Sequence, residues 1–257
     1  MGNGLSEPRS LFPALPAFRS LHIVILGLDC AGKTTVLYRL RFNEFLNTVP
    51  TKGFNAEKVR LRLGGSRRCA SFHLWDVGGQ ERLRPLWRAY TRGADGLVFV
   101  VDSVDAERLE EARAELHKVA RLAENHGVPV LVVANKQDLR GSLAPAQIQE
   151  ALALAELSPA TPWHLQPACA IIGEGLADGL ERLHAMIGKR RKALRQQQRQ
   201  RRRRQGDPSR PRVWADTGPV RTPSGATDTQ HDKRSRSPWQ HQALRQVPPV
   251  KSTPGQR

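Results

Sequence analysis

Residues 27–34 constrain the fold of this chain more than any other segment, because they read Gly-Leu-Asp-Cys-Ala-Gly-Lys-Thr. They lie between an apolar run at 21–26 and a helix-like stretch at 35–41. A glycine-rich turn in that place directs backbone N–H groups and a helix N-terminus at a polyphosphate, and the lysine reaches its terminal phosphates. This placement disfavours an ordinary turn. The predicted nucleotide-binding residues are Gly27, Leu28, Asp29, Cys30, Ala31, Gly32, Lys33 and Thr34.

A second pattern selects the base. The apolar run at 128–134 predicts a buried parallel strand, and residues 135–138 follow it as Asn-Lys-Gln-Asp, where ligands of open α/β sheets bind. The Asp138 carboxylate can accept from N1–H and the exocyclic amine of guanine, whereas adenine offers no matching donors. After the apolar stretch at 163–168, the Ala170 N–H is placed to donate to guanine O6. Taken alone, residues 135–138 could be a polar turn. Because they follow the loop at 27–34 in the expected order, the two motifs together favour GTP or GDP over ATP. The predicted base-binding residues are Asn135, Lys136, Asp138, Cys169 and Ala170.

A third group of residues predicts Mg²⁺ binding and GTP hydrolysis. The alternating stretch at 72–76 predicts a strand that ends in Asp76, near the Mg²⁺ that Thr34 would also bind. Thr51 follows Pro50 and is expected to complete the Mg²⁺ shell from a loop that orders on GTP, although a Thr after Pro is commonly a turn residue. The Gly79 amide is expected to bond the γ-phosphate, and Gln80 is expected to orient the attacking water.

Basic residues concentrate in the C-terminal part of the chain. Residues 189–257 carry 19 Lys and Arg against 4 acids, whereas residues 1–188 carry 22 against 20. A cluster at the start of this part is expected to bind anionic membrane lipids, each residue contributing about 1 kcal/mol near the surface. The cluster fits a nuclear import signal read by importin equally well, and a solvated charge run without a partner is the third alternative. Its members are Lys189, Arg190, Arg191, Lys192, Arg201, Arg202, Arg203 and Arg204.

Other function classes are disfavoured by the sequence. Nucleic-acid binding is not expected, because Trp214 and Trp239 are isolated among polar residues and prolines. The three cysteines are too scattered for zinc spacing and fit a reducing compartment. No run approaches 18 apolar residues and no signal peptide is found, so we expect a cytosolic chain with reversible membrane anchoring.

The periodicity predicts one α/β domain with a doubly wound, mostly parallel sheet. Expected strands lie near 21–27, 54–63, 69–76, 96–101, 128–134 and 164–169, and expected helices near 33–41, 105–125, 145–155 and 176–195. The last helix should keep one apolar face, formed by Leu176, Leu180, Leu183, Ile187 and Leu194. We expect four segments: an N-terminal arm at 1–20, the domain at 21–188, a polybasic segment at 189–205 and a disordered extension at 206–257.

Together these motifs resemble those of small GTPases of the ADP-ribosylation-factor family, over residues 1 to about 188. The resemblance is carried by the loop at 27–35, by Pro50-Thr51 with Gly53-Phe54-Asn55, by residues 75–80 and by Arg84-Pro85-Leu86-Trp87. Lys52, Asn43-Glu44-Phe45 and the basic end are most similar to the fourth factor-like subfamily. The resemblance adds Thr35 to the nucleotide site and implies a P-loop GTPase fold.

The resemblance also implies an activity and partners. A GTPase of this type hydrolyses GTP slowly without an activating protein, and no arginine finger is identifiable in cis. Implied partners are an exchange factor, an activating protein and effectors such as cytohesin-type exchange factors. Effectors would touch a hydrophobic triad, Phe54, Trp75 and Tyr90, although core burial is an equal alternative for Trp75.

The N-terminus predicts a membrane signal. Residues 1–6 satisfy the M-G-x-x-x-S pattern, so Gly2 is expected to be myristoylated. One acyl chain binds only marginally, and three prolines interrupt a helix in the arm, so the basic cluster would supply a second anchor. The expected locations are the cytoplasmic face of membranes, foremost the plasma membrane, the cytoplasm, and the nucleus and nucleolus. An alternative function is a nucleotide-binding scaffold whose main output is tail-mediated targeting, which the presence of Gln80 argues against.

Overall fold

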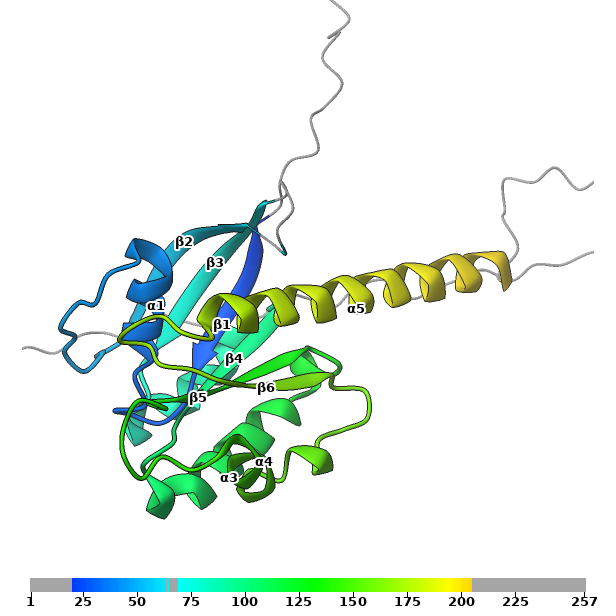
Figure 1. Ribbon diagram of the computed structural model, residues 1–257. Coiled ribbons are helices and arrows are strands. Elements are labelled where there is room, and N and C mark those ends of the chain that lie inside the picture. Colours follow the sequence, from blue (N-terminus) through cyan, green and yellow to red (C-terminus); the bar gives the residue numbers. More distant parts are fainter. Residues whose placement is uncertain (1–19, 63, 65–68, 205–257) are drawn as a thin grey trace, which may run out of the picture. The chain divides into compact units, whose positions relative to one another are not determined.

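The computed structural model describes residues 20–62, 64 and 69–204 of the 257-residue chain (Figure 1). Its strands form one six-stranded sheet in the order β2-β3-β1-β4-β5-β6. Within it, β2 pairs antiparallel with β3, and the other described neighbours are parallel. The strands are β1 Leu21–Leu26, β2 Phe54–Arg62, β3 Cys69–Val77, β4 Gly96–Asp102, β5 Val130–Asn135 and β6 Trp163–Pro167. The predicted doubly wound α/β fold is confirmed.

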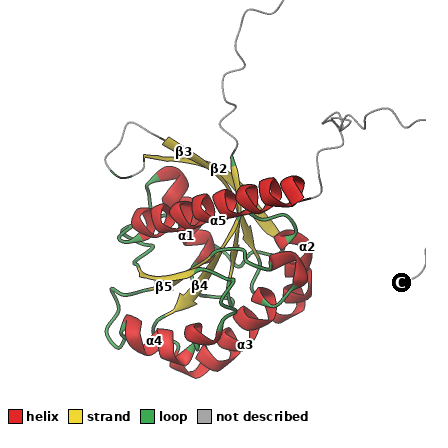
Figure 2. Cartoon of the chain, turned by 90° about the vertical axis from the view of Figure 1, so that its right-hand side faces the viewer, coloured by secondary structure: helices red, strands yellow, loops and turns green. Residues whose placement is uncertain are grey.

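Helices cover both faces of the sheet (Figure 2). One core cluster joins one face of the sheet to α1 and α5, and a second joins the opposite face to the α2–α4 side. Along β1, Ile23 and Ile25 belong to the first cluster and Val24 and Leu26 to the second, as strand alternation requires. The helices are α1 Lys33–Phe42, α2 Trp87–Thr91, α3 Leu109–Ala120, α4 Pro145–Ala151 and α5 Leu176–Arg204.

The middle of the chain differs from the sequence-based expectation in two places. The single helix expected at 105–125 is a 3₁₀ turn, then α3, then a second 3₁₀ turn at Ala123–Asn125. The buried Asn125 Nδ2 donates to the Val119 carbonyl oxygen at 3.0 Å, and this bond helps to end α3. The 3₁₀ turn Glu81–Leu86 and the five-residue α2 were not predicted, because both are shorter than a periodic pattern can reveal.

The last helix is longer than predicted and ends at Arg204 rather than near 195. Residues 189–204 contain no Gly or Pro and consist mainly of Arg, Lys and Gln, all good helix formers. Leu176, Leu180, Leu183 and Ile187 are buried as expected, but Leu194 is 43% exposed because the helix has passed the end of the sheet (Figure 1). The segment boundary predicted at 188–189 falls inside this continuous helix.

Several predictions concern residues outside the described ranges. Gly2, nearly all of the N-terminal arm and the extension at 206–257 are among them. The backbone of Arg202, Arg203 and Arg204 belongs to α5, whereas their side chains are not described. None of the described helices combines the length and apolar content that a bilayer span needs.

Candidate functional site

The loop between β1 and α1 brings backbone N–H groups to a helix N-terminus. Gly27 has φ 136°, and a Cβ there would lie 2.2 Å from the Val100 carbonyl oxygen, so only glycine fits. Gly32 is the N-cap of α1 with φ 91° and carries no side chain that could occupy the free N–H groups. Residues 32–35 line a cavity of about 310 Å³. The first turn of α1 therefore offers free donors to an anion, as phosphate binding requires.

Lys33 is buried at the floor of this cavity. Its side chain is 6% exposed, and its Nζ donates to the Leu28 carbonyl oxygen at 2.6 Å. Burial lowers the pKa of Lys33 to about 8, and the Asp76 and Asp29 carboxylates only partly oppose that shift. A bound phosphate would supply the negative charge that the ammonium lacks here.

We therefore expect nucleotide affinity to fall as pH rises above about 8. Bound phosphates raise the Lys33 pKa above its value of about 8 in the free site, so binding takes up a proton above that pH. The dissociation constant for GDP should then increase by up to about tenfold per pH unit. Titration with fluorescent GDP at pH 7, 8 and 8.8 measures this. The matched control is Lys33→Arg, whose guanidinium does not titrate. An equal pH slope in both proteins would assign the effect to other groups, including guanine N1.

Three oxygen-bearing side chains meet beside Lys33. The Thr34 hydroxyl donates to Asp76 Oδ2 at 2.7 Å, and the Thr51 hydroxyl lies 3.0 Å from Thr34 Oγ1 and 3.4 Å from Asp76 Oδ2. Asn55 Nδ2 also donates to Asp76 Oδ2, at 3.1 Å. Asp76 is fully buried, and its Oδ1 has no hydrogen-bond partner among the described residues. Two hydroxyls beside an unpaired carboxylate oxygen fit Mg²⁺, which binds one or two carboxylates together with substrate phosphates.

The glycine pair after β3 packs against the phosphate loop. A Cβ on Gly79 would lie 2.5 Å from Lys33 Nζ, so this backbone can approach the lysine only as glycine. Trp87 Nε1 donates to the Gly78 carbonyl oxygen at 3.0 Å, and Arg84 Nε donates to the Gly79 carbonyl oxygen at 3.0 Å. Gln80 follows at the cavity wall.

Arg84 is a positioning residue that sequence reasoning had noted only as part of a family motif. Its side chain is buried, and Nη1 bonds Glu111 Oε1 at 2.7 Å. Because its guanidinium is engaged by Glu111 and Gly79, Arg84 is not free to enter the cavity. Sequence reasoning also missed Arg108. Its Nη1 lies 3.2 Å from Asp29 Oδ1 and holds that carboxylate toward the start of α3.

The base-binding residues converge from the ends of β5 and β6. The buried Asn135 donates through Nδ2 to the Ala31 carbonyl oxygen at 2.9 Å and accepts from the Ala170 N–H through Oδ1 at 2.9 Å. The Ala170 amide predicted to face guanine O6 is thus paired with Asn135 in this structure. Lys136 Nζ bonds Asp102 Oδ2 at 2.5 Å, whereas Asp138 is exposed and lines the cavity. Burial raises the pKa of the neighbouring Cys169 thiol, and the Asp138 carboxylate adds to the shift.

The structure brings most predicted site residues to this one cavity. Gly27, Leu28, Ala31, Asp76 and Cys169 instead lie behind its wall. Lining the cavity are Asp29, Cys30, Gly32, Lys33, Thr34, Thr35, Thr51, Gly79, Gln80, Asn135, Lys136, Asp138 and Ala170. Sequence reasoning missed four apolar wall residues, Phe45, Val49, Leu139 and Ile171, each exposed by 45% or more. The sequence signal available for them was their position, because each is an apolar residue in or beside a loop that carries a site motif.

The predicted triad forms an aromatic surface. Phe54 stacks on Trp75 with ring centroids 5.1 Å apart, and Tyr90 lies 5.5 Å from Phe54 and 6.4 Å from Trp75. Phe54 is 48% exposed and the other two are half-buried. Trp75 is therefore only partly buried, and its ring packs against Phe54.

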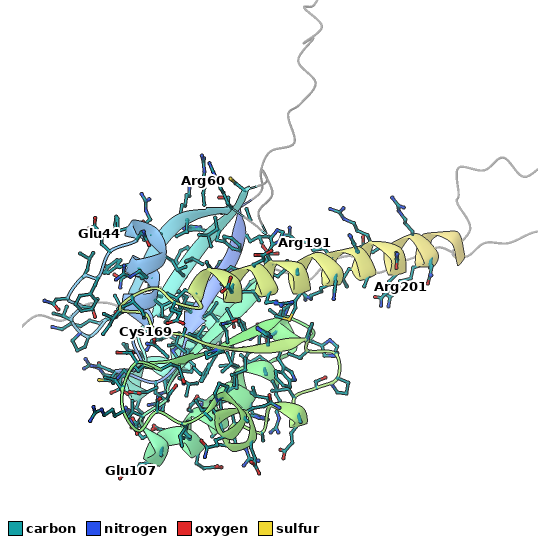
Figure 3. All side chains as sticks on the ribbon, in the orientation of Figure 1. Glu44, Arg60, Glu107, Cys169, Arg191 and Arg201 are labelled. Atoms are coloured by element: carbon teal, nitrogen blue, oxygen red, sulfur yellow. The ribbon has the colours of Figure 1, made fainter. Side chains whose placement is uncertain are left out.

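The basic cluster begins where α5 still contacts the domain. Arg191 pairs with Asp95 Oδ1 at 2.7 Å, and Arg190 donates to the His126 carbonyl oxygen at 3.3 Å. Lys189 and Lys192 are exposed, as is Arg201 on the part of α5 that extends past the domain (Figure 3). The cluster thus includes two arginines that hold the helix to the domain.

The comparisons with known proteins agree with this geometry. The model of the ADP-ribosylation factor family matches residues 9–187. ADP-ribosylation factor-like protein 4A of Mus musculus is 70% identical over 197 residues, which cover 77% of this chain and 98% of that protein. Factor-like protein 4C of Homo sapiens is 64% identical over 183 residues, covering 71% and 95%, and factor-like protein 4D of Bos taurus is 58% identical over 195, covering 76% and 97%.

A solved structure of a small GTPase also matches. The Arl6 BBS3 small GTPase from Trypanosoma brucei, with bound nucleotide analogue GppNp, is 29% identical with a TM-score of 0.58. The match covers 66% of this chain and 98% of that chain. The family match and the nucleotide-bound neighbour together support GTP binding and hydrolysis. This chain belongs to the ADP-ribosylation factor family and is a GTPase of the factor-like 4 type.

Proposed function

We propose that this GTPase is a membrane-anchored switch that recruits effectors in its GTP state, in trafficking, actin or signalling pathways. Lys33 and the α1 N-terminus bind the phosphates, and Asp138 recognises guanine. Thr34, Thr51 and Asp76 would hold Mg²⁺, which would supply positive charge to neutralise the phosphates. Gln80 orients the attacking water, and the Gly79 N–H donates to the γ-phosphate only in the GTP state.

The observation that carries this proposal is the short path from the Mg²⁺ site to the aromatic surface. Thr51 contacts Thr34 and Asp76, and only two residues separate it from Phe54, which stacks on Trp75. The Gly78 N–H donates to the Gly53 carbonyl oxygen at 2.9 Å and ties this path to the glycine pair. A loop that releases Thr51 after hydrolysis would therefore also displace Phe54.

The proposed membrane signals leave the domain from one edge. The His22 N–H donates to Asp95 Oδ2 at 3.0 Å, while Arg191 binds Asp95 Oδ1 at 2.7 Å. His22 lies near the start of β1, so the arm that carries Gly2 begins close to the start of the basic cluster. This edge holds the amino ends of the parallel strands, opposite the nucleotide cavity. The arm and the basic cluster are thus attached to the same edge of the domain.

Proteins of this family are regulated by exchange factors, activating proteins and effectors. For this chain we propose cytohesin-type exchange factors as effectors, anionic lipids as the membrane ligand, and importin as a reader of the same basic cluster. The proposed locations are the cytoplasmic face of the plasma membrane, the cytoplasm, and the nucleus and nucleolus.

We expect stable membrane binding to need both Gly2 and basic residues of the cluster. A single myristoyl chain is a marginal anchor, and each basic residue adds about 1 kcal/mol near an anionic surface. Gly2→Ala should release most of the protein from vesicles. Neutralising Lys189, Lys192 and Arg201 to Arg204 should reduce binding at least about tenfold and weaken its salt dependence. Sedimentation of the acylated chain with vesicles of graded phosphatidylserine content, at low and high salt, measures both effects.

The neutralised set leaves Arg190 and Arg191 intact, because these residues contact the domain. The matched control replaces the four exposed Gln residues at 196–198 and 200 by Ser, which changes the same part of α5 without changing its charge. Equal, salt-insensitive binding of the charge-neutralised chain and the wild type to neutral vesicles would contradict the two-signal proposal.

A further inference from the structure

Arg39 on α1 binds backbone carbonyl groups from two separate segments without lining the cavity. Its Nε donates to the Ala170 carbonyl oxygen at 3.3 Å, and its Nη2 donates to the Ile171 carbonyl oxygen. Its Nη1 donates to the Asn43 carbonyl oxygen at 2.8 Å. Within the described ranges Arg39 forms no ion pair with a carboxylate. Its three donors are used to hold main chain, which a planar guanidinium does better than an ammonium.

The carbonyls that Arg39 binds belong to the segment at the base end of the cavity. The Ala170 peptide is held on both sides, because its N–H donates to Asn135 Oδ1 while its carbonyl accepts from Arg39. Both Ala170 and Ile171 line the cavity. This segment is further supported by its own backbone, because the Gly173 N–H donates to the Cys169 carbonyl oxygen at 2.8 Å and the Cys169 N–H donates to the Glu174 carbonyl oxygen at 3.1 Å. Without Arg39, the outer side of the segment would lose its side-chain anchor.

The third bond of Arg39 reaches the start of the loop that carries Thr51. Asn43 ends α1 with φ 58°, and its N–H donates to the Arg39 carbonyl oxygen at 2.9 Å. Main chain and side chain of Arg39 therefore both bind Asn43. One residue thus connects the base end of the cavity with the beginning of the Thr51 loop.

We infer that Arg39 is a positioning residue that holds residues 169–172 against the guanine base and so slows nucleotide release. This inference rests on the proposed guanine site, in which guanine O6 would accept from the Ala170 N–H that Asn135 Oδ1 engages in the present structure. Arg39 binds the base segment through two hydrogen bonds, whereas it reaches the Thr51 loop only at Asn43, eight positions before Thr51. Its effect should therefore depend mainly on the base.

The test measures dissociation of mant-labelled GDP from the full-length chain. Arg39→Ala should release GDP about tenfold faster, since it removes three hydrogen bonds, two of them to the base segment. Arg39→Lys keeps the charge but not the planar fork, and it should give an intermediate rate. The matched control is Arg41→Ala in the same helical turn. The exposed Arg41 pairs with the half-buried Glu57 at 3.1 Å, and its loss should leave GDP release at the wild-type rate.

A second nucleotide separates positioning from a general loss of structure. The mant-labelled diphosphate of 2-aminopurine riboside lacks O6, so the base segment has no carbonyl to bind. It also lacks the N1–H proposed to bind Asp138 but keeps the exocyclic amine, and the comparison is therefore made between Arg39→Ala and wild type for each nucleotide. For this nucleotide, Arg39→Ala should change the dissociation rate less than about twofold. Equal acceleration for both nucleotides, or wild-type GDP release by Arg39→Ala, would overturn the inference. If wild-type protein released both nucleotides equally fast, the O6 contact would be absent, and the proposed guanine contact of this segment would fail together with the inference.

Discussion

Replacing Asp138 by asparagine is expected to convert a guanine-specific protein into one that prefers xanthine nucleotides. Asp138 is exposed at the cavity wall, where its carboxylate can accept from both N1–H and the exocyclic amine of guanine. An amide would place a donor opposite that amine and leave two donors facing each other. The same amide matches xanthine, which carries a carbonyl at this position. Because each hydrogen bond to a charged group contributes about 1.5–3 kcal/mol, GDP affinity should fall by a factor of roughly a hundred or more.

Competition of GDP, xanthosine diphosphate and ADP against fluorescent GDP measures this change. A matched control is Glu174→Gln, which removes a carboxylate from the neighbouring loop without changing a cavity-lining residue. The control should keep the wild-type order of affinities. If Asp138→Asn also kept that order, with GDP still the tightest ligand, the assignment of the base-binding residues would be wrong.

The parts of this protein that sequence predicts well are those in which one local pattern has one structural solution. The continuous apolar runs of β4 and β5 are buried on both faces, and the glycines at 27 and 32 need positive φ that other residues rarely adopt. Hence six strands, the order of elements and the convergence of Lys33, Thr34 and Asp138 on one cavity follow from the sequence.

What the sequence could not predict depends on contacts between distant segments. Arg84 binds Glu111 from another helix, Arg108 holds Asp29, and Arg39 reaches Ala170 across 131 positions. No local periodicity marks an arginine that donates to a remote carbonyl. The length of α5 was underestimated for another reason: the apolar period ends after Ile187, but helix propensity alone continues the helix to Arg204.

Replacing Gln80 by leucine is expected to leave nucleotide binding unchanged and to reduce assisted GTP hydrolysis by about a hundredfold or more. Gln80 lines the cavity directly after Gly79, whose backbone approaches Lys33. Its side-chain amide can both donate to and accept from a water, whereas leucine has similar volume and can do neither. Arg84, the buried arginine nearest to this segment, binds Glu111 and the Gly79 carbonyl oxygen, so it cannot replace the lost function.

Single-turnover phosphate release, with and without an activating protein of the ADP-ribosylation factor type, measures the effect of Gln80→Leu. The matched control is Arg82→Ala. Arg82 Nε donates to Gln80 Oε1 at 3.2 Å on the exposed side, so its loss should change assisted hydrolysis only about twofold. Equilibrium binding of GDP should be the same in all three proteins, because Gln80 is not assigned to the base or to the phosphate-binding donors. Wild-type turnover by Gln80→Leu in the presence of the activating protein would show that another group orients the water, and the hydrolytic role would then pass to a residue outside the Gly78–Gly79–Gln80 segment.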